Sequence, residues 1–185
     1  DAGNTDSLTE VKPGEYHTNT LVGTAGRTYR LSVKTEGRQY DAVSKMNNPV
    51  TIDTAWIQEL SFFGRSGKVV IATFKDPANE VNFYRLQAFR NGIKKNNFRI
   101  SNDKITNGKQ KELNITPEGD INKGDTIQLD LQSIDEPVWT YYNTLNNSAN
   151  STQTAAPANP ESNLTYPALG YFSAYSVRSK VIYAP

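Results

Sequence analysis

The chain has 185 residues, no cysteine, and 20 basic against 19 acidic side chains, for a net charge of +1. The absence of cysteine excludes a disulfide scaffold, a thiolate zinc site and a cysteine nucleophile. A net charge this close to zero gives no overall field that would attract nucleic acid or an anionic membrane surface. The length and the 36% hydrophobic content suit one ordinary domain, or a small module attached to a larger one.

The longest wholly apolar run is Val69 to Ala72, far below the roughly 20 residues of a membrane-spanning helix. The first residues, DAGNTDSLTEV, show neither the basic region nor the apolar region of a secretory signal. We therefore expect a soluble chain. We treat residues 1–185 as a fragment, the mature or trimmed product of a precursor. An export signal or a lipid anchor on that precursor is compatible with these residues.

A β-hairpin is predicted over residues 28–46. Its first half alternates apolar and polar side chains, which is the period of a half-buried strand. Glu36-Gly37 supplies a turn, and the second half returns with Tyr40 and Ala42 facing inward.

Further strands are predicted in the middle of the chain. Residues 50–63 carry apolar side chains on both faces, as in a strand of a sandwich or barrel. Residues 69–74 and 81–89 flank the turn-forming cluster DPANE, and we predict that they form a second hairpin. The Asn-Gly pair at 91–92 tolerates positive φ, which predicts that residues 97–100 pair back on the preceding strand.

Residues 101–125 are polar and are interpreted as loops around a short strand at 113–115, without a core of their own. Residues 126–132 alternate cleanly and predict a strand whose odd-numbered side chains are buried. Residues 171–183 are predicted to close the fold as one long strand.

One helix is predicted near residues 135–146. Ser133 or Asp135 can cap it, and Pro137 suits its first turn, where the missing N–H costs nothing. The following Asn/Ser/Thr/Ala/Pro-rich tract is too polar to bury a core, so a flexible loop is expected over residues 146–167.

Several segments taken together resemble one family. They are AGRTYRLSVKTEGRQY after PGEY, FKDPANEVNFYRLQAFRNG, LQSIDEPVWTYYNTL, AAPANP and ALGYFSAYSV. In this order they resemble the Bacteroidetes domain-of-unknown-function family 4249 over most of residues 13–183. The resemblance implies an exported, lipid-anchored protein of the Gram-negative outer membrane, often encoded beside TonB-dependent transporters. It also implies an N-terminal immunoglobulin-like β module before a second β domain, and it defines no activity and no functional residues.

The chain departs from the family pattern by lacking the lipobox cysteine and most of the first module. We expect an all-β protein, with the remnant of an immunoglobulin-like hairpin module over residues 1–48 and a module boundary near Asn47 to Pro49. A β-sandwich or barrel domain with one short helix is expected over residues 49–185. Membrane attachment would come only through an N-terminal lipid anchor, which is absent from this chain.

Candidate catalytic groups lie in sequence contexts that favour other roles. His17 is the only histidine and has no nucleophile motif such as G-x-S-x-G to serve, so we expect it on the surface. Asp76 and Glu80 lie in one turn sequence, where acidic residues favour local hydrogen bonding. The same holds for Asp120 and Asp125. A carboxylate-dependent hydrolase would need two of these four groups to converge in a cleft.

The sequence predicts no metal, cofactor or nucleic acid. Asp120-x-Asn122-x-x-Asp125 offers oxygen ligands for Ca²⁺ but lacks the glycine and the distal glutamate of an EF-hand loop. Seven Lys and Arg residues cluster around one hairpin and interleave with Phe89 and Phe98, a pattern that nucleic-acid binding also uses. We instead expect both rings in the core, with the lysines solubilising an edge strand.

Aromatic side chains are the candidate ligand-binding residues, because flat rings bind sugars or peptides at low entropic cost. The candidates are Trp56, Trp139, Tyr141, Tyr142 and Tyr166, with Tyr171 and Tyr175 as further members. The alternative is that these rings build the core and the helix packing.

We predict a non-enzymatic accessory protein of the cell envelope that binds a TonB-dependent transporter or an extracellular ligand. The polar loops 101–125 and 146–167 are the expected contact surface, because loops on a rigid scaffold commonly carry recognition. A glycan-binding module is the alternative within binding, and a carboxylate-dependent hydrolase is the alternative from another class.

Overall fold

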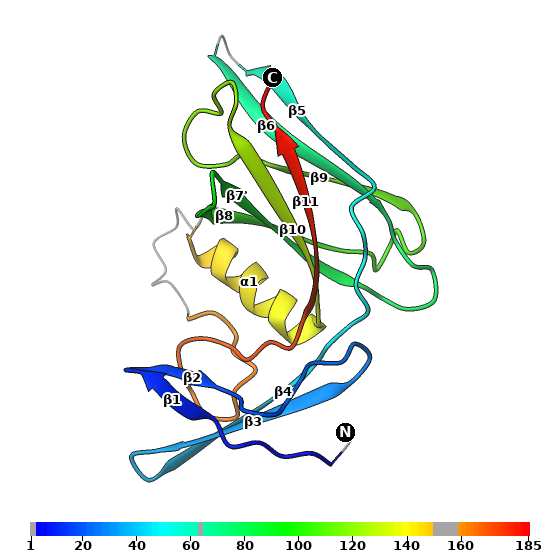
Figure 1. Cartoon of the computed structure of the whole chain (residues 1–185). Helices are drawn as coiled ribbons and strands as arrows, with labels where there is room; N and C mark the ends of the chain where they lie inside the picture. Colours follow the sequence, from blue (N-terminus) through cyan, green and yellow to red (C-terminus); the bar gives the residue numbers. More distant parts are fainter. Residues whose placement is uncertain (1–2, 63–64, 150–158) are drawn as a thin grey trace.

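The computed structural model describes residues 3–62, 65–149 and 159–185. Within these ranges the chain forms eleven strands in four sheets and one helix (Figure 1). The strand orders are open rather than circular, so the larger part of the described chain is a sandwich and not a closed barrel.

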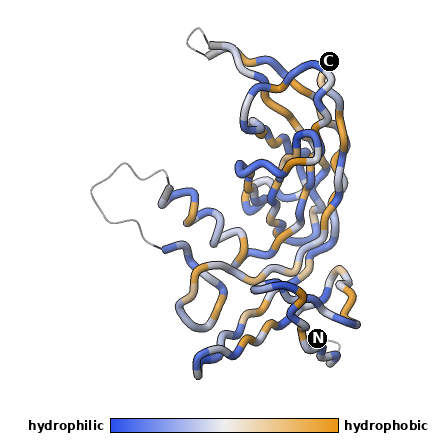
Figure 2. The backbone as a smooth tube through the Cα atoms, turned by 60° about the vertical axis from the view of Figure 1, so that its left-hand side comes forward, coloured by the Kyte–Doolittle hydropathy of each residue, from blue (hydrophilic) through white to orange (hydrophobic). Residues whose placement is uncertain are grey.

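Two antiparallel sheets face each other across the main core. Sheet I contains, in spatial order, β11 (Ser176–Tyr183), β10 (Thr126–Ile134), β7 (Phe83–Arg90) and β8 (Ile93–Asn102). Sheet II contains β5 (Thr54–Phe62), β6 (Arg65–Lys75) and β9 (Gln110–Ile115). Figure 2 shows hydrophobic and hydrophilic residues interspersed along the backbone of the sandwich.

The side chains between sheets I and II are mostly apolar. Those that sheet I buries completely are Tyr84, Leu86 and Ala88 of β7 and Ile127, Leu129 and Leu131 of β10. The predicted strand over 126–132 and its buried odd-numbered positions are therefore confirmed.

Helix α1 (Glu136–Ala149) covers the outer face of sheet I and adds a third layer (Figure 1). Asp135 caps it, because its Oδ1 accepts the N–H of Val138 at 3.2 Å. Pro137 lies in the first turn, as predicted. The predicted helix is confirmed, with Asp135 rather than Ser133 as its cap.

Two small sheets precede the sandwich. They are β1 (Thr9–Lys12) with β2 (Glu15–His17), and β3 (Thr28–Thr35) with β4 (Arg38–Lys45). The predicted hairpin is confirmed as β3–β4, paired without any register shift. Its turn residues Glu36 and Gly37 have φ of 50° and 72°, as a two-residue turn between twisted strands requires.

The segment 159–175 joins the β3–β4 hairpin to the sandwich (Figure 1). Ala42 of β4 forms an antiparallel bridge with Leu164. At the base of the hairpin, the N–H of Lys45 donates to Oδ2 of Asp135 at 2.9 Å. The predicted module boundary follows β4 directly, and residues on both sides of it share hydrogen bonds.

The predicted second hairpin is wrong, because β6 and β7 belong to different sheets. The DPANE cluster between them crosses from sheet II to sheet I. Both strands bury large rings in the same core from opposite sides: Phe74 and Tyr84 meet edge to face with centroids 4.8 Å apart. The Asn-Gly hairpin is confirmed as β7–β8, with positive φ at both Asn91 and Gly92.

The last strand and the region 101–125 differ from prediction. The last strand begins at Ser176, because residues 171–175 turn toward the hairpin, where the N–H of Ala174 donates to Ser44 Oγ at 2.9 Å. The region 101–125 does supply core, since Ile121 is buried together with β9. Residues 150–158 of the predicted flexible loop lie outside the described residues.

Candidate functional site

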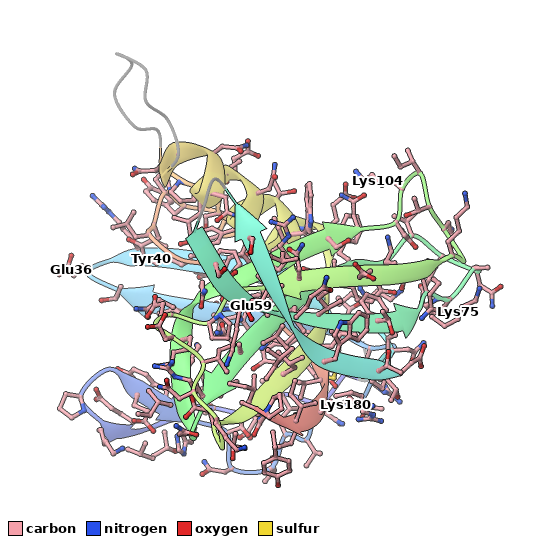
Figure 3. The ribbon with its side chains drawn as sticks, turned by 90° about the horizontal axis from the view of Figure 1, so that it is seen from above. Glu36, Tyr40, Glu59, Lys75, Lys104 and Lys180 are labelled. Carbon is pink, nitrogen blue, oxygen red and sulfur yellow. The ribbon has the colours of Figure 1, made fainter. Side chains whose placement is uncertain are left out.

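A groove of about 300 Å³ lies between the β3–β4 hairpin and the segment that follows α1. It is lined by Leu31, Val33 and Tyr40 of the hairpin and by Leu164, Ala168, Leu169, Gly170 and Tyr171 of the segment. We call it the hairpin groove. Figure 3 shows Glu36 at the tip of the hairpin and Tyr40 next to the segment. A hollow of about 420 Å³ at the tip is lined by residues 34–39 of that turn alone.

The alternation of the two strands explains the groove. Val33 pairs with Tyr40 and Leu31 pairs with Ala42, so all four side chains share one face. Leu164 covers this face at Ala42, which is buried, but the cover does not extend to Val33 near the tip, which stays exposed. The groove is therefore the uncovered end of a buried face.

Tyr166 forms part of the rim. Its ring meets Tyr40 edge to face with centroids 5.9 Å apart, and the guanidinium carbon of Arg38 lies 5.6 Å from its centre. Tyr166 is 48% exposed. The rim thus combines an accessible ring with a positive charge.

Tyr171 connects the groove to α1. Its ring centre lies 4.6 Å from that of Tyr141 and 5.2 Å from that of Tyr142, and the hydroxyls of Tyr142 and Tyr171 share a hydrogen bond. Burial, followed by this hydrogen bond, raises the pKa of Tyr142 above its usual 10.0. Tyr142 is therefore a neutral packing and hydrogen-bonding group at physiological pH.

Arg85 lies beneath Tyr142, between α1 and sheet I, and is only 8% exposed. Its guanidinium carbon lies 4.6 Å from the ring centre of Tyr142 and 5.2 Å from that of Phe98. Its Nη1 donates to Gln132 Oε1 at 2.9 Å, and its Nη2 donates to Gln87 Oε1 at 2.6 Å. Two amides and two rings thus surround a buried cation that the sequence did not single out.

The predicted aromatic residues fall into separate places. Tyr141 and Tyr142 come together with Tyr171, whereas Trp139 packs on Phe83, with ring centroids 5.9 Å apart. Trp56 lies on β5 and faces away from the core, on the side of the sandwich opposite α1. The structure therefore places only part of the predicted set near the hairpin groove.

The candidate carboxylates also separate. Asp76 is buried and accepts the hydroxyl of Tyr84 at 2.5 Å, whereas Glu80 is half-buried and pairs with Lys45 at 3.3 Å. Burial raises the pKa of Asp76, and the neighbouring buried Asp103 raises it further, against the lowering effect of the Tyr84 hydrogen bond. This pair of aspartates belongs to the interior of the sandwich.

Asp120 and Asp125 lie at the opposite end of β7 from Asp76, roughly 25 Å away for a strand of this length. Asp125 accepts the Asn91 amide at 2.7 Å and the N–H of Asn122 at 2.8 Å. These hydrogen bonds lower the pKa of Asp125. In the described ranges, no three acidic or histidine side chains are grouped as a metal site would require.

The remaining candidates occupy ordinary structural positions. His17 is exposed on β2, with its Nε2 2.9 Å from Glu15 Oε1, as expected for a surface residue. Both rings that were expected in the core are only partly buried: Phe98 packs against the buried cluster beneath α1, and Phe89 belongs to neither buried cluster. Lys111 of the basic cluster is buried and donates to the carbonyl of Asn102 at 2.9 Å.

The family model described as Domain of unknown function (DUF4249) matches residues 1–181. The chain belongs to this family. The DUF4249 match includes both walls of the hairpin groove, α1 and nearly all of β11. No curated protein and no solved structure matches the chain. Among the residues that the structure describes, no helix has the length and apolar character to cross a membrane.

Proposed function

We propose that this DUF4249 protein is a non-enzymatic accessory protein of the cell envelope that binds a TonB-dependent outer-membrane transporter through the hairpin groove. The observation that carries the proposal is the groove itself, a concave apolar surface formed by two segments far apart in the sequence. The envelope location, the lipid anchor and the class of partner rest on what the family resemblance implies.

The apolar side chains of the groove are unusually accessible. Leu169 is 83% exposed and Val33 is 40% exposed, although both line the groove. Single exposed apolar residues are ordinary, but apolar residues gathered in one concavity with a polar rim are typical of protein interaction sites.

The segment wall is held in place before any partner binds. Asn163 donates through Nδ2 to the carbonyl of Phe172 at 2.7 Å and accepts the N–H of Phe172 at 2.9 Å. Ser162 Oγ donates to the carbonyl of Gly170 at 2.7 Å. These contacts close the loop at its two ends, so binding orders less of the chain and costs less entropy.

The proposal is tested by site-specific photo-crosslinking of the full-length protein in its native cells. A photoreactive residue at position 169 is compared with one at Ile105, which is 92% exposed and lies on a different loop. We expect a TonB-dependent transporter to be identified by mass spectrometry from position 169 and not from position 105. Equal crosslinking at both positions, or a product from position 169 without a transporter, contradicts the proposal.

A further inference from the structure

The outer edge of β3 is a second feature of the hairpin. In the described part of the chain, residues 30–34 of β3 pair with β4 alone and make no backbone hydrogen bond on their other side. The edges of the sandwich are protected differently, because β11 lies against β5 and β8 lies against β9. β3 is eight residues long, regular and free of proline, features that leave an edge open to a further strand.

The hydrogen bonds of β4 identify which groups point outward. Asp41 accepts the N–H of Thr165 at 2.8 Å, and Val43 accepts the side-chain amide of Asn163 at 3.3 Å. The odd-numbered residues of β4 thus direct their backbone groups away from β3. The even-numbered residues are left to bond to β3, because the two directions alternate in an antiparallel pair.

The same alternation applies to β3. Arg30, Ser32 and Lys34 stand opposite Val43, Asp41 and Gln39 in the register. Their N–H and C=O groups therefore point away from β4 toward the open edge. Each of these three alternate residues therefore offers one N–H donor and one C=O acceptor to an incoming strand.

The side chains along this edge differ between the two faces. Arg30 and Lys34 are exposed on one face, whereas Leu31 and Val33 line the hairpin groove on the other. Residues 27–45 contain five basic and two acidic residues, a balance of +3. Those seven are Arg27, Arg30, Lys34, Arg38 and Lys45, with Glu36 and Asp41.

We propose that an extended segment of the partner protein adds to β3 as a third strand of the hairpin sheet, with acidic and apolar side chains in alternation. Side chains opposite the odd positions of β3 enter the hairpin groove, and those opposite the even positions meet Arg30 and Lys34. Backbone hydrogen bonds give affinity and the alternating side chains give specificity. This inference rests on the proposed function and adds the chemistry of the bound segment.

The probe is a fluorescent peptide of four Glu-Val repeats, titrated by anisotropy against the 185-residue protein. Two control peptides are used. The first consists of four Lys-Val repeats, and the second is the Glu-Val peptide with N-methyl groups at every second residue on its pairing edge. We expect binding of the Glu-Val peptide alone, with slowed amide exchange at Arg30, Ser32 and Lys34. Equal binding of the N-methylated peptide, or no binding of the Glu-Val peptide at millimolar concentration, overturns the inference.

Two variants separate strand addition from general stickiness. Ser32→Pro removes an N–H that faces the open edge and leaves the β3–β4 ladder its partners, so the hairpin is expected to fold. It should weaken binding of the Glu-Val peptide by up to about tenfold, since one backbone hydrogen bond is lost, whereas Ser32→Ala should have no effect. Replacing both Arg30 and Lys34 by Glu should lower the affinity for the Glu-Val peptide several-fold relative to the parent protein. The same double change should raise the affinity for the Lys-Val peptide.

Crosslinking distinguishes failure of this inference from failure of the proposed function. If position 169 captures the transporter in both the parent and the Ser32→Pro protein, groove binding stands and strand addition is wrong. If the peptide binds as expected but no transporter is captured, the open edge is a binding site and the transporter assignment is wrong.

Discussion

The two faces of sheet I are buried by different means. Toward sheet II, β7 presents Tyr84, Leu86 and Ala88 to an almost wholly apolar layer. Toward α1, the same strand presents Arg85 and Gln87, which are joined to each other by a hydrogen bond. One strand thus takes part in an apolar interface on one face and in a polar, aromatic interface on the other.

The difference bears on what each interface does for the fold. Apolar burial is non-directional and supplies most of the stabilisation. The α1 interface relies on polar groups whose hydrogen bonds are directional, and within the described residues it leaves Arg85 Nε and Trp139 Nε1 buried without a hydrogen-bond partner. We infer that the sandwich core holds the domain together, while the α1 layer fixes the position of the helix and, through Tyr171, of the groove wall.

The largest expected effect comes from the apolar interface. Leu86→Ala should lower the free energy of unfolding by about 3 kcal/mol, because it opens a cavity at a residue with 0% exposure. Urea unfolding measures it. The matched control Leu169→Ala, at 83% exposure, should change stability by no more than about 0.5 kcal/mol. Equal losses in the two variants would contradict the placement of the core.

Arg85→Ala should lower the free energy of unfolding by less, about 2 kcal/mol, because burial has already removed the hydration of the guanidinium. The change leaves two glutamine oxygens without their donor and empties the slot between two rings. Near-ultraviolet circular dichroism and amide exchange in α1 should report a loosened helix. Arg85→Lys should recover only part of the loss, because an ammonium cannot replace the planar fork. Full recovery by lysine would show that charge alone matters there.

Much of the fold followed from local patterns in the sequence. Period-two alternation and turn chemistry predicted β3–β4, β10 and the Asn-Gly hairpin, and the Asp-x-Pro start predicted α1. The sequence did not predict which strands pair with which. The apolar and polar side chains of β6 and β7 alternate in the same way whether the two strands pair with each other or face each other across a core. The wrong hairpin between them is therefore an error of topology and not of secondary structure.

The site was harder to predict for the same reason. Tyr166 was identified as an aromatic candidate, but Leu31 and Leu169 were not, because their meeting depends on the bridge between Ala42 and Leu164. Arg85 has the polar character expected of an exposed strand face. Only the position of α1 over that face makes it buried.

The smallest expected effect concerns a hydrogen bond at the apolar interface between the two sheets, donated by the hydroxyl of Tyr84 to Asp76. The pKa of Asp76 is raised above 3.8, mainly by burial, so ionisation destabilises the fold and stability from this group falls as pH rises through the folded pKa. Tyr84→Phe removes a hydrogen bond that lowers this pKa. Its deficit, about 1 kcal/mol at pH 7, should therefore shrink at pH 4, as urea unfolding would measure. Tyr142→Phe loses a hydrogen bond to a neutral hydroxyl and should show the same deficit at both pH values. A pH-independent deficit for Tyr84→Phe would mean that Asp76 does not ionise in the folded protein over this range, and that the apolar layer tolerates only its neutral form.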